Sequence, residues 1–383
     1  MKIVLVLGGY GNFGQRIVET LASEHHIHLV IAGRNLNSAQ VLLKTLTANT
    51  KADLSAMAID VNSVDFTAQL LKLNPFLVIH TCGPYQGQSN KVAKACIDAK
   101  AHYIDLADDP DYVASVSTFD DVAKDKDICL ISGASSVPGL SAAVIDKYQR
   151  HFAQINSIDI AIAPGNKAER GQATVKGILS YVGHGFRAFR GGKWQQVYGW
   201  MEPRKHLFGL GLGKRWLANV DVPDLTLFPE RYKVKDYVRF QAGLELPILH
   251  LSMVAMAKLV KVGLVKNWAT LTKPIFNLSL LFKYFGTEDG GMEVNIKGVN
   301  EQGKSIHLRW TLFAPNGIGP YIPTLSAIIA ANKLLTDNTD KRGADACVDI
   351  FAIEDFYPYF KQFGIEYEHQ FKYEVIEGES IAE

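Results

Sequence analysis

The stretch Ile3-Val4-Leu5-Val6-Leu7-Gly8-Gly9-Tyr10-Gly11-Asn12-Phe13-Gly14 decides the fold, because closely spaced glycines follow directly after a short apolar run. Gly9, Gly11 and Gly14 satisfy the pattern G-x-G-x-x-G. The pattern predicts a strand, a tight turn and a helix whose free N–H groups and positive dipole end hold a pyrophosphate. An ordinary glycine-rich turn is the alternative, but the position between strand and helix favours dinucleotide binding.

Short apolar runs alternate with amphipathic stretches through the first third of the chain. The runs that we expect to be strands are Ile3–Leu7, His28–Ala32, Ser55–Ile59, Phe76–Thr81, His102–Leu106 and Ile128–Ser132. The stretches that we expect to be helices are Phe13–Ala22, Ser38–Leu46, Val64–Leu71, Ser89–Ala99 and Asp111–Lys124. This alternation predicts an α/β domain with a doubly wound parallel sheet of the Rossmann type.

The residues after the second strand indicate which dinucleotide binds. An NAD site usually has a carboxylate there, for the adenosine ribose, whereas this chain has Ala32-Gly33-Arg34-Asn35. The fork-shaped guanidinium of Arg34 suits the 2′-phosphate of NADP, so we expect NADP as the cofactor. A solvated loop arginine is the alternative.

The ends of two further predicted strands are expected beside the same dinucleotide-binding turn. Asp60, followed by Val61, can accept a hydrogen bond from the adenine amino group, and the turn Cys82-Gly83-Pro84 is expected beneath the ribose and nicotinamide. No basic partner is visible beside Cys82. We therefore interpret Cys82 as a small buried side chain that lines the site and not as a nucleophile.

Several of these motifs together resemble the saccharopine dehydrogenase-like oxidoreductases. The resemblance rests on the glycine pattern and on the runs Val78–Gln86, Ala95–Ala99, His102–Leu106 and Gly133–Gly139, and it is close over about the first 140 residues. It implies a phosphate loop of Gly9, Gly11, Asn12, Phe13 and Gly14, with Arg34 on the 2′-phosphate. It also implies adenine contacts from Asp60 and Val61 and a nicotinamide-side turn of Gly83 and Pro84.

One residue departs from the pattern of the family. Members that act on saccharopine tend to carry an acidic residue before the Pro-Gly of the turn at 133–139, and this chain has Val137. A carboxylate that could bind a substrate ammonium group is therefore missing, and we expect saccharopine to be a poor substrate. Other members resembling this chain are lipid-pathway enoyl reductases.

Wider-spaced strands follow the first third and predict a second, α+β domain. We expect a mixed or antiparallel sheet, with one face covered by helices, from Ser157–Ala163, Tyr237–Ala242, Met292–Val299 and Ser305–Phe313. Helices are expected near Leu140–His151, Thr174–Phe189, Ile248–Val265, Trp268–Phe285 and Pro323–Thr336. The predicted domains are 1–140 for the dinucleotide, 141–345 for substrate and dimerisation, and a C-terminal segment 346–383 that packs back on the first domain.

Few side chains suit catalysis. A hydride transfer to a carbonyl or enone needs a proton source near the nicotinamide, and Tyr85 and Lys167 are the predicted catalytic residues. Asp105, Arg170 and His184 are weaker candidates. For each of them a surface or packing role is the alternative.

Composition excludes several classes of function. Forty Lys and Arg against 39 Asp and Glu give a net charge of +1, which removes the global electrostatic argument for a nucleic-acid partner. The four cysteines form no C-x-x-C pair, and His25, His26 and His28 have no nearby ligand partners, so we expect no metal. The start lacks a signal-type apolar region, no stretch is long and apolar enough to span a bilayer, and we expect a cytoplasmic protein.

The sequence therefore predicts an NADP(H)-dependent oxidoreductase, forming a homodimer, with a small-molecule substrate in the cleft between its domains. The alternatives are a membrane-surface enoyl reductase acting on a lipid or polyketide, and a non-catalytic dinucleotide sensor. The segment 246–287 contains five lysines and no acidic residue, which favours peripheral membrane contact. At 100° per residue, His250, Lys258 and Lys261 are expected on one stripe of its first helix, and Leu249, Met253, Met256 and Val260 on the other side. A helix packed on the second sheet or at a dimer interface is the alternative for this segment.

Overall fold

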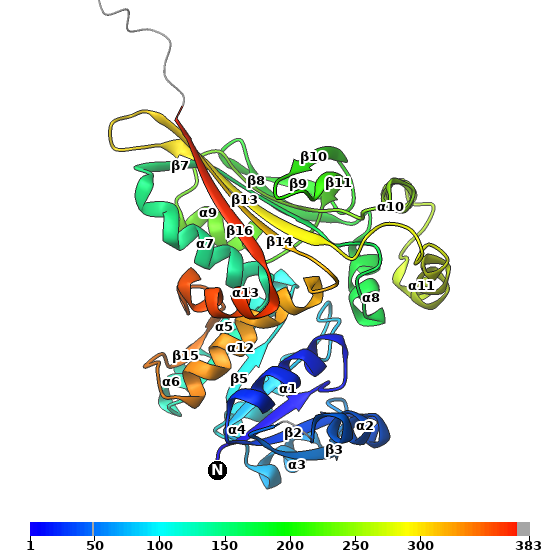
Figure 1. The fold of residues 1–383 in the computed structure, drawn as a ribbon, viewed down its shortest axis with the longest axis vertical. Helices are drawn as coiled ribbons and strands as arrows, with labels where there is room; N and C mark the ends of the chain where they lie inside the picture. The colour runs from blue at the N-terminus through cyan, green and yellow to red at the C-terminus, as the bar shows by residue number, and fades with distance from the viewer. Residues whose placement is uncertain (48–49, 374–383) are drawn as a thin grey trace, which may run out of the picture. The chain divides into compact units, whose positions relative to one another are not determined.

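Residues 1–47 and 50–373 are described by a computed structural model, and they form two compact units (Figure 1). The first unit consists of Met1–Leu140, Glu169–Gly177 and Pro320–Phe351. The second consists of Ser141–Ala168, Ile178–Gly319 and the described residues from 352 to 373. The chain therefore passes between the units repeatedly, and not once near residue 140 as a simple two-domain reading implies.

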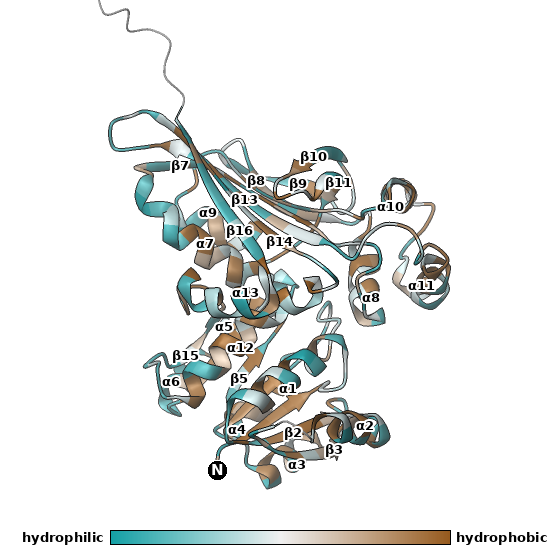
Figure 2. Ribbon diagram, in the orientation of Figure 1, coloured by the Kyte–Doolittle hydropathy of each residue, from teal (hydrophilic) through white to brown (hydrophobic). Residues whose placement is uncertain are grey.

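The first unit is built on a seven-stranded parallel sheet with the order β15-β6-β5-β4-β1-β2-β3. Its strands are β1 Ile3–Leu7, β2 His28–Gly33, β3 Asp53–Ala58, β4 Leu77–His80, β5 His102–Asp105, β6 Cys129–Ser132 and β15 Gly343–Ala346. Val4 to Leu7 of β1 are fully buried, and Figure 2 shows the central strands in the brown of hydrophobic residues. Strands buried on both faces are typical of a parallel sheet covered by helices, so the predicted fold class is confirmed.

The helices of this unit fall in the segments between the strands. They are α1 Asn12–Glu24, α2 Leu36–Leu46, α3 Phe66–Leu73, α4 Lys91–Asp98, α5 Pro110–Ser117, α6 Asp120–Asp125 and α12 Ile322–Leu335, with short turns η1 Ser136–Leu140 and η4 Gly319–Tyr321. The helix α8 Gln172–Tyr181 begins in this unit.

Part of the predicted second domain lies in the first unit. α12 packs against α1, where Tyr321 donates a hydrogen bond to Glu19 over 3.2 Å and lies under the guanidinium of Arg16. β15 pairs with β6 and completes the sheet. Of the predicted C-terminal segment, 346–351 lies in the first unit, whereas the described residues from 352 onward lie in the second.

The second unit is built on a seven-stranded mixed sheet with the order β10-β11-β12-β7-β13-β14-β16. Its strands are β7 Gln154–Ala163, β10 Arg204–Phe208, β11 Gly213–Asn219, β12 Tyr237–Ala242, β13 Gly290–Val299, β14 Ser305–Ala314 and β16 Glu366–Tyr373. Only β12 and β7 pair in parallel among these described strands. The predicted hairpin of 292–313 is present as β13 and β14.

Helices of the second unit are α7 Ser141–Tyr148, α9 Asp224–Arg231, α10 Pro247–Lys261, α11 Thr272–Leu280 and α13 Tyr357–Phe363, with short turns η2 Gln149–His151, η3 Ala269–Leu271 and η5 Ile353–Phe356. The helix predicted over 174–189 is wrong in its second half. α8 ends at Tyr181, Gly183 has a φ of +76°, and the chain then forms the hairpin β8 Gly185–Arg190 and β9 Lys193–Tyr198. Glycine tolerates this left-handed backbone, which a helix cannot contain.

Candidate dinucleotide site

The turn between β1 and α1 forms the centre of the predicted site. The N–H groups of Gly8 and Gly9 donate to the carbonyl of Ala32 over 2.9 and 3.0 Å, and Gly11 N–H donates to the carbonyl of Gly8 over 2.8 Å. α1 begins at the next residue, Asn12. The first N–H groups of a helix lack acceptors within that helix, so this turn presents several donors at the carboxyl edge of the sheet.

Two glycines keep the turn tight. A Cβ on Gly14 would lie 2.2 Å from the carbonyl oxygen of Gly8, and one on Gly11 would lie 3.0 Å from the same oxygen. Both contacts are with backbone, which cannot move aside as the end of a flexible side chain can. The residues that carry the phosphate-binding pattern are therefore packed as that pattern requires.

Tyr10 braces the end of β2, a role that the sequence analysis did not assign. Its ring fills the space where a Cβ on Gly33 would stand, 2.5 Å from the nearest ring carbon. Its hydroxyl accepts a hydrogen bond from the N–H of Asn35 over 2.9 Å. Arg34 lies between these two anchored residues, its side chain is exposed, and no carboxylate of the described residues forms an ion pair with it.

The loops after β3 and β4 lie next to this turn. Asp60 accepts from the N–H of Asn62 over 2.9 Å, which closes the turn that contains Val61. Gln88 holds the loop of Gly83 and Pro84 by donating to the carbonyls of Cys82 and Pro84 over 2.7 and 2.6 Å.

The thiol of Cys82 lies among the elements of the site. Burial raises its pKa to about 12, while the positive charge of Arg34 acts in the opposite direction and the negative charge of Asp60 adds to the rise. A Cβ on Gly8 would lie 3.1 Å from its sulfur. The thiol is therefore protonated at neutral pH, in line with the interpretation of Cys82 as a lining residue.

Tyr85 does not have the surroundings of a proton donor. Its side chain is 5% exposed, and its hydroxyl donates to the carbonyl of His80 over 2.6 Å. Burial raises its pKa well above the ordinary value. We therefore withdraw Tyr85 as a catalytic residue, because its hydroxyl is committed inside the fold.

Lys167 lies in the second unit, and so the two predicted catalytic residues do not share a unit. Its side chain is exposed, and its backbone N–H donates to the carbonyl of Thr287 over 2.9 Å. Asp105 is also structural. It is buried and accepts from the N–H groups of Ala107 and Gly133 over 2.9 and 2.8 Å, which fastens the loop after β6.

The segment Glu169–Gly177 lies beside the dinucleotide turn, which no sequence signal indicated. Glu169 forms an ion pair with Arg16 of α1 at 2.8 Å. A Cβ on Gly171 would lie 3.6 Å from Asn12, and one on Gly177 would lie 3.0 Å from the side chain of Gln86. Arg170, a weaker sequence candidate, is partly buried in this segment.

Asp108 contacts the Cys82–Gln86 loop through a hydrogen bond with Gln86. It follows β5, and its Oδ1 accepts from Nε2 of Gln86 over 3.1 Å. Burial raises the pKa of this carboxyl. Asp108 was not predicted as a site residue. It stands in the acidic run Asp108-Asp109, and such a run is typical of the start of a helix.

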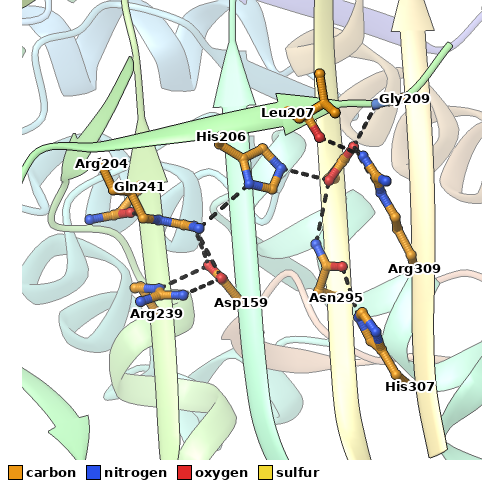
Figure 3. A network of polar contacts seen from close by, with 11 residues as sticks. Asp159, Arg204, His206, Leu207, Gly209, Arg239, Gln241, Asn295, His307 and Arg309 are labelled. Carbon is orange, nitrogen blue, oxygen red and sulfur yellow. Dashed lines mark hydrogen bonds and ion pairs between the residues drawn. The ribbon is translucent and has the colours of Figure 1, made fainter. Parts of the chain in front are cut away.

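A second polar cluster lies on one face of the sheet in the other unit (Figure 3). Asp159 of β7 lies between Arg204 and Arg239, with Nη2 of Arg204 3.0 Å and Nε of Arg239 3.1 Å from its Oδ1. Fully buried Glu293 of β13 accepts from Nε2 of His206 over 2.7 Å and pairs with Arg309.

A pocket of about 290 Å³ adjoins this cluster, lined by His206, Leu207, Asn295, His307, Arg309, Gln370 and Lys372. The alternation of polar residues on β13 and β14 was the sequence signal for a polar face. Because the two carboxylates already pair with arginines, the cluster stabilises the sheet and we assign it no catalytic role.

Val137 lies in the buried segment Ser136–Leu140. It is 7% exposed. Nearby, a Cβ on Gly139 would lie 2.5 Å from the hydroxyl of Ser326 in α12. The turn at 133–139 is thus packed within the first unit.

Comparisons with known proteins agree with this geometry. Residues 4–131 match the family model of the saccharopine dehydrogenase NADP binding domain. No curated protein matches the sequence of the chain.

Two solved structures are similar over nearly the whole chain. Apo saccharopine dehydrogenase (L-Glu forming) from Saccharomyces cerevisiae is 14% identical, with a TM-score of 0.70 over 97% of this chain and 100% of that one. The homospermidine synthase of Legionella pneumophila, in complex with NAD, is 12% identical, with a TM-score of 0.59 over 97% of this chain and 91% of that one.

At such identities the structural similarity establishes the fold alone, and residues 4–131 match the model of one nucleotide-binding domain family. The expected resemblance is confirmed, and a nicotinamide dinucleotide is supported as the cofactor. Residues 4–131 of the chain are therefore similar to the saccharopine dehydrogenase NADP binding domain.

Proposed function

We propose that the chain is an NADP(H)-dependent oxidoreductase that transfers a hydride to or from a small-molecule substrate. The observation that carries the choice of NADP is the exposed guanidinium of Arg34 directly after β2, which forms no ion pair with any described carboxylate. Tyr10 fixes the backbone on both sides of it through Gly33 and Asn35. A guanidinium held in this way can bind a 2′-phosphate through two parallel hydrogen bonds.

The residues of the first unit fit a dinucleotide. The glycines keep the turn tight, since a Cβ on Gly14 would clash with the carbonyl oxygen of Gly8, and the first N–H groups of α1 can bind the diphosphate. Asp60 can accept from the adenine amino group, and the Cys82–Pro84 loop can line the nicotinamide side. The bound cofactor supplies or accepts the hydride, and the protein supplies position and a proton.

Asp108 is our candidate for the proton donor, in place of Tyr85. In a reduction of a carbonyl, the hydride adds to carbon and the proton of a neutral Asp108 passes to oxygen. A carboxyl whose pKa is raised by burial holds that proton closer to neutral pH than an exposed one. Its hydrogen bond from Gln86 ties it to the nicotinamide-side loop.

Binding of the two cofactors to the purified chain tests the proposal. NADPH should bind at least about tenfold more tightly than NADH, since a charge-assisted hydrogen bond contributes about 1.5–3 kcal/mol. Arg34→Ala should remove the preference by weakening NADPH binding alone. The matched control is Lys44→Ala, which removes an exposed cation from α2. Equal dissociation constants for NADPH and NADH in the unsubstituted protein would refute the assignment of Arg34.

A second candidate function is the reduction of a carbon–carbon double bond in a lipid. The exposed apolar side chains of α10 and α11 favour this function. A lipid substrate is delivered from a membrane or a carrier, and exposed apolar side chains can contact either one. Consumption of NADPH with enoyl esters of increasing chain length would separate the two candidates. A rise in turnover with chain length supports the lipid substrate, and turnover of short polar carbonyl compounds alone supports the first candidate.

A further inference from the structure

The segment 246–287 exposes an unusual share of apolar side chains. Of the 20 large hydrophobic side chains that are exposed among the described residues, 11 lie in this segment. Val262, Leu264, Leu281 and Tyr284 are 68%, 74%, 68% and 84% exposed. Figure 2 shows brown residues recurring along α10 and α11. Exposed apolar side chains scattered singly are ordinary, but a cluster of this size in one segment marks an interaction surface.

Helix α10 is apolar on two sides. Its core side carries buried residues from His250 to Val260. Its outer side carries Ile248, Leu251 and Leu259, which are 62%, 43% and 38% exposed and share one face at helical spacing. Packing against the second unit explains the first side only.

Helix α11 has no buried residue at all, although Ile275, Leu278 and Leu280 belong to it. A helix of nine residues has little stability of its own in water. The exposed side chains of Leu278 and Leu280 therefore gain a hydrophobic environment only from something outside the described residues.

Hydrogen bonds anchor the C-terminal end of the segment to the rest of the second unit. Asn166, 6% exposed, donates through Nδ2 to the carbonyls of Phe282 and Phe285 over 2.7 and 3.0 Å. Glu245 accepts from the N–H of Thr287 over 2.9 Å. These contacts present the apolar side chains in a fixed arrangement, which reduces the entropy lost when they bind.

The charges of the segment indicate the kind of partner that this surface binds. Lys258, Lys261, Lys266, Lys273 and Lys283 are all exposed, and residues 246–287 contain no aspartate or glutamate. A chain that is nearly neutral overall thus concentrates positive charge where it concentrates exposed apolar side chains. Lysines beside apolar and aromatic side chains are typical of segments that lie in the interface of an anionic bilayer.

We propose that the exposed side chains of 246–287 dock on the surface of a membrane that contains anionic lipids. Leu278, Leu281, Tyr284 and Phe285 enter the boundary between headgroups and acyl chains, while the lysines contact the headgroups. No helix of the described residues is long and apolar enough to cross a bilayer. Burying the segment against a second copy through a two-fold contact would bring two lysine clusters together, which disfavours that occupant.

Flotation of the full-length protein with vesicles tests the proposal. Vesicles of phosphatidylcholine with 30% phosphatidylserine should carry the protein at low salt, whereas vesicles of phosphatidylcholine alone should carry much less. Added salt should reduce the bound fraction, because it screens the lysines. The double variant Lys273→Ala/Lys283→Ala should lower the partition coefficient by on the order of tenfold.

Exposed positions provide matched variants that leave the fold intact. Leu281→Asp and Tyr284→Ser should abolish flotation, while Val64→Asp, at a 98% exposed site in the first unit, should leave it unchanged. Thermal melting and NADPH binding should be the same in all variants. Protein that remains unbound to anionic vesicles at low salt would overturn the proposal. So would flotation that Leu281→Asp leaves intact, or a dimer without vesicles that Leu281→Asp dissociates.

Discussion

Asp108 and Tyr85 show how burial and hydrogen bonding decide the chemistry of a single residue. Both follow strands of the same sheet near its carboxyl edge. The Tyr85 hydroxyl donates to a backbone carbonyl inside the fold, whereas the Asp108 carboxyl accepts from the side chain of Gln86. The sequence indicated Tyr85 and not Asp108, because it does not show which polar atom is already used inside the fold.

Asp108→Asn should lower kcat by about 100-fold, since general acids contribute roughly 10²–10⁴-fold. The unsubstituted enzyme should lose reductive activity as pH rises through the raised pKa of Asp108, because only the protonated form donates. The variant should lack this decline. Profiles of kcat against pH for both proteins provide the measurement, and Asp111→Asn in the first turn of α5 is the control. An unchanged profile in Asp108→Asn would exclude Asp108 as the donor.

Strands and helices with a local signal were predicted well, and those set by distant contacts were not. The glycine turn and the six predicted strands of the first sheet depend on short-range apolar patterns and are present. In α10, the periodicity predicted the helix but placed His250 with the lysines, whereas His250 is fully buried beside Trp200. Apolar residues on both sides of a helix leave its core face undetermined by sequence.

Glu293 of β13 links three strands, because it accepts hydrogen bonds from His206 of β10 and from Arg309 of β14. Burial favours its neutral form, yet the hydrogen bonds from His206, Arg309 and the N–H of Gly209 hold its pKa below the ordinary value. The ionised form therefore stabilises the fold above the pKa of the unfolded chain, about 4.3, and this contribution is lost as pH falls below it.

Glu293→Gln should destabilise the second unit by about 3–5 kcal/mol, because it leaves a guanidinium without its carboxylate. The double variant Glu293→Gln/Arg309→Met should cost less than the single one. Denaturant unfolding at pH 7 measures both, and at pH 4 the difference between Glu293→Gln and the unsubstituted protein should shrink. A single variant as stable as the parent at pH 7 would show that the ion pair contributes nothing.

The whole molecule is less modular than its sequence suggests. The predicted boundary at residue 140 is a real crossing between units, but the first unit also needs Glu169–Gly177, α12 and β15. β15 is the four-residue strand Gly-Ala-Asp-Ala, which has no apolar run, and its pairing with β6 spans most of the chain. Local patterns carry no information about such a contact.

A fragment of residues 1–140 should therefore fail to fold cooperatively, although it contains the entire dinucleotide motif. It lacks the strand that covers β6 and the helix that covers α1, so apolar surface stays exposed. Circular dichroism on heating and NADPH binding would measure this, with the full chain as reference. A fragment that melts sharply and binds NADPH would show that the later segments are dispensable.

β15 is synthesised long after β6, and this delay affects how the first sheet folds during translation. Roughly 200 residues separate the end of β6 from the start of β15, so at about 5–20 residues per second the ribosome needs on the order of 10–40 s to supply the missing strand. During that interval the nascent sheet has an open edge at β6, and an open edge can pair with another chain. Chaperones that bind the nascent chain at this stage would keep the open edge of β6 from pairing with another chain.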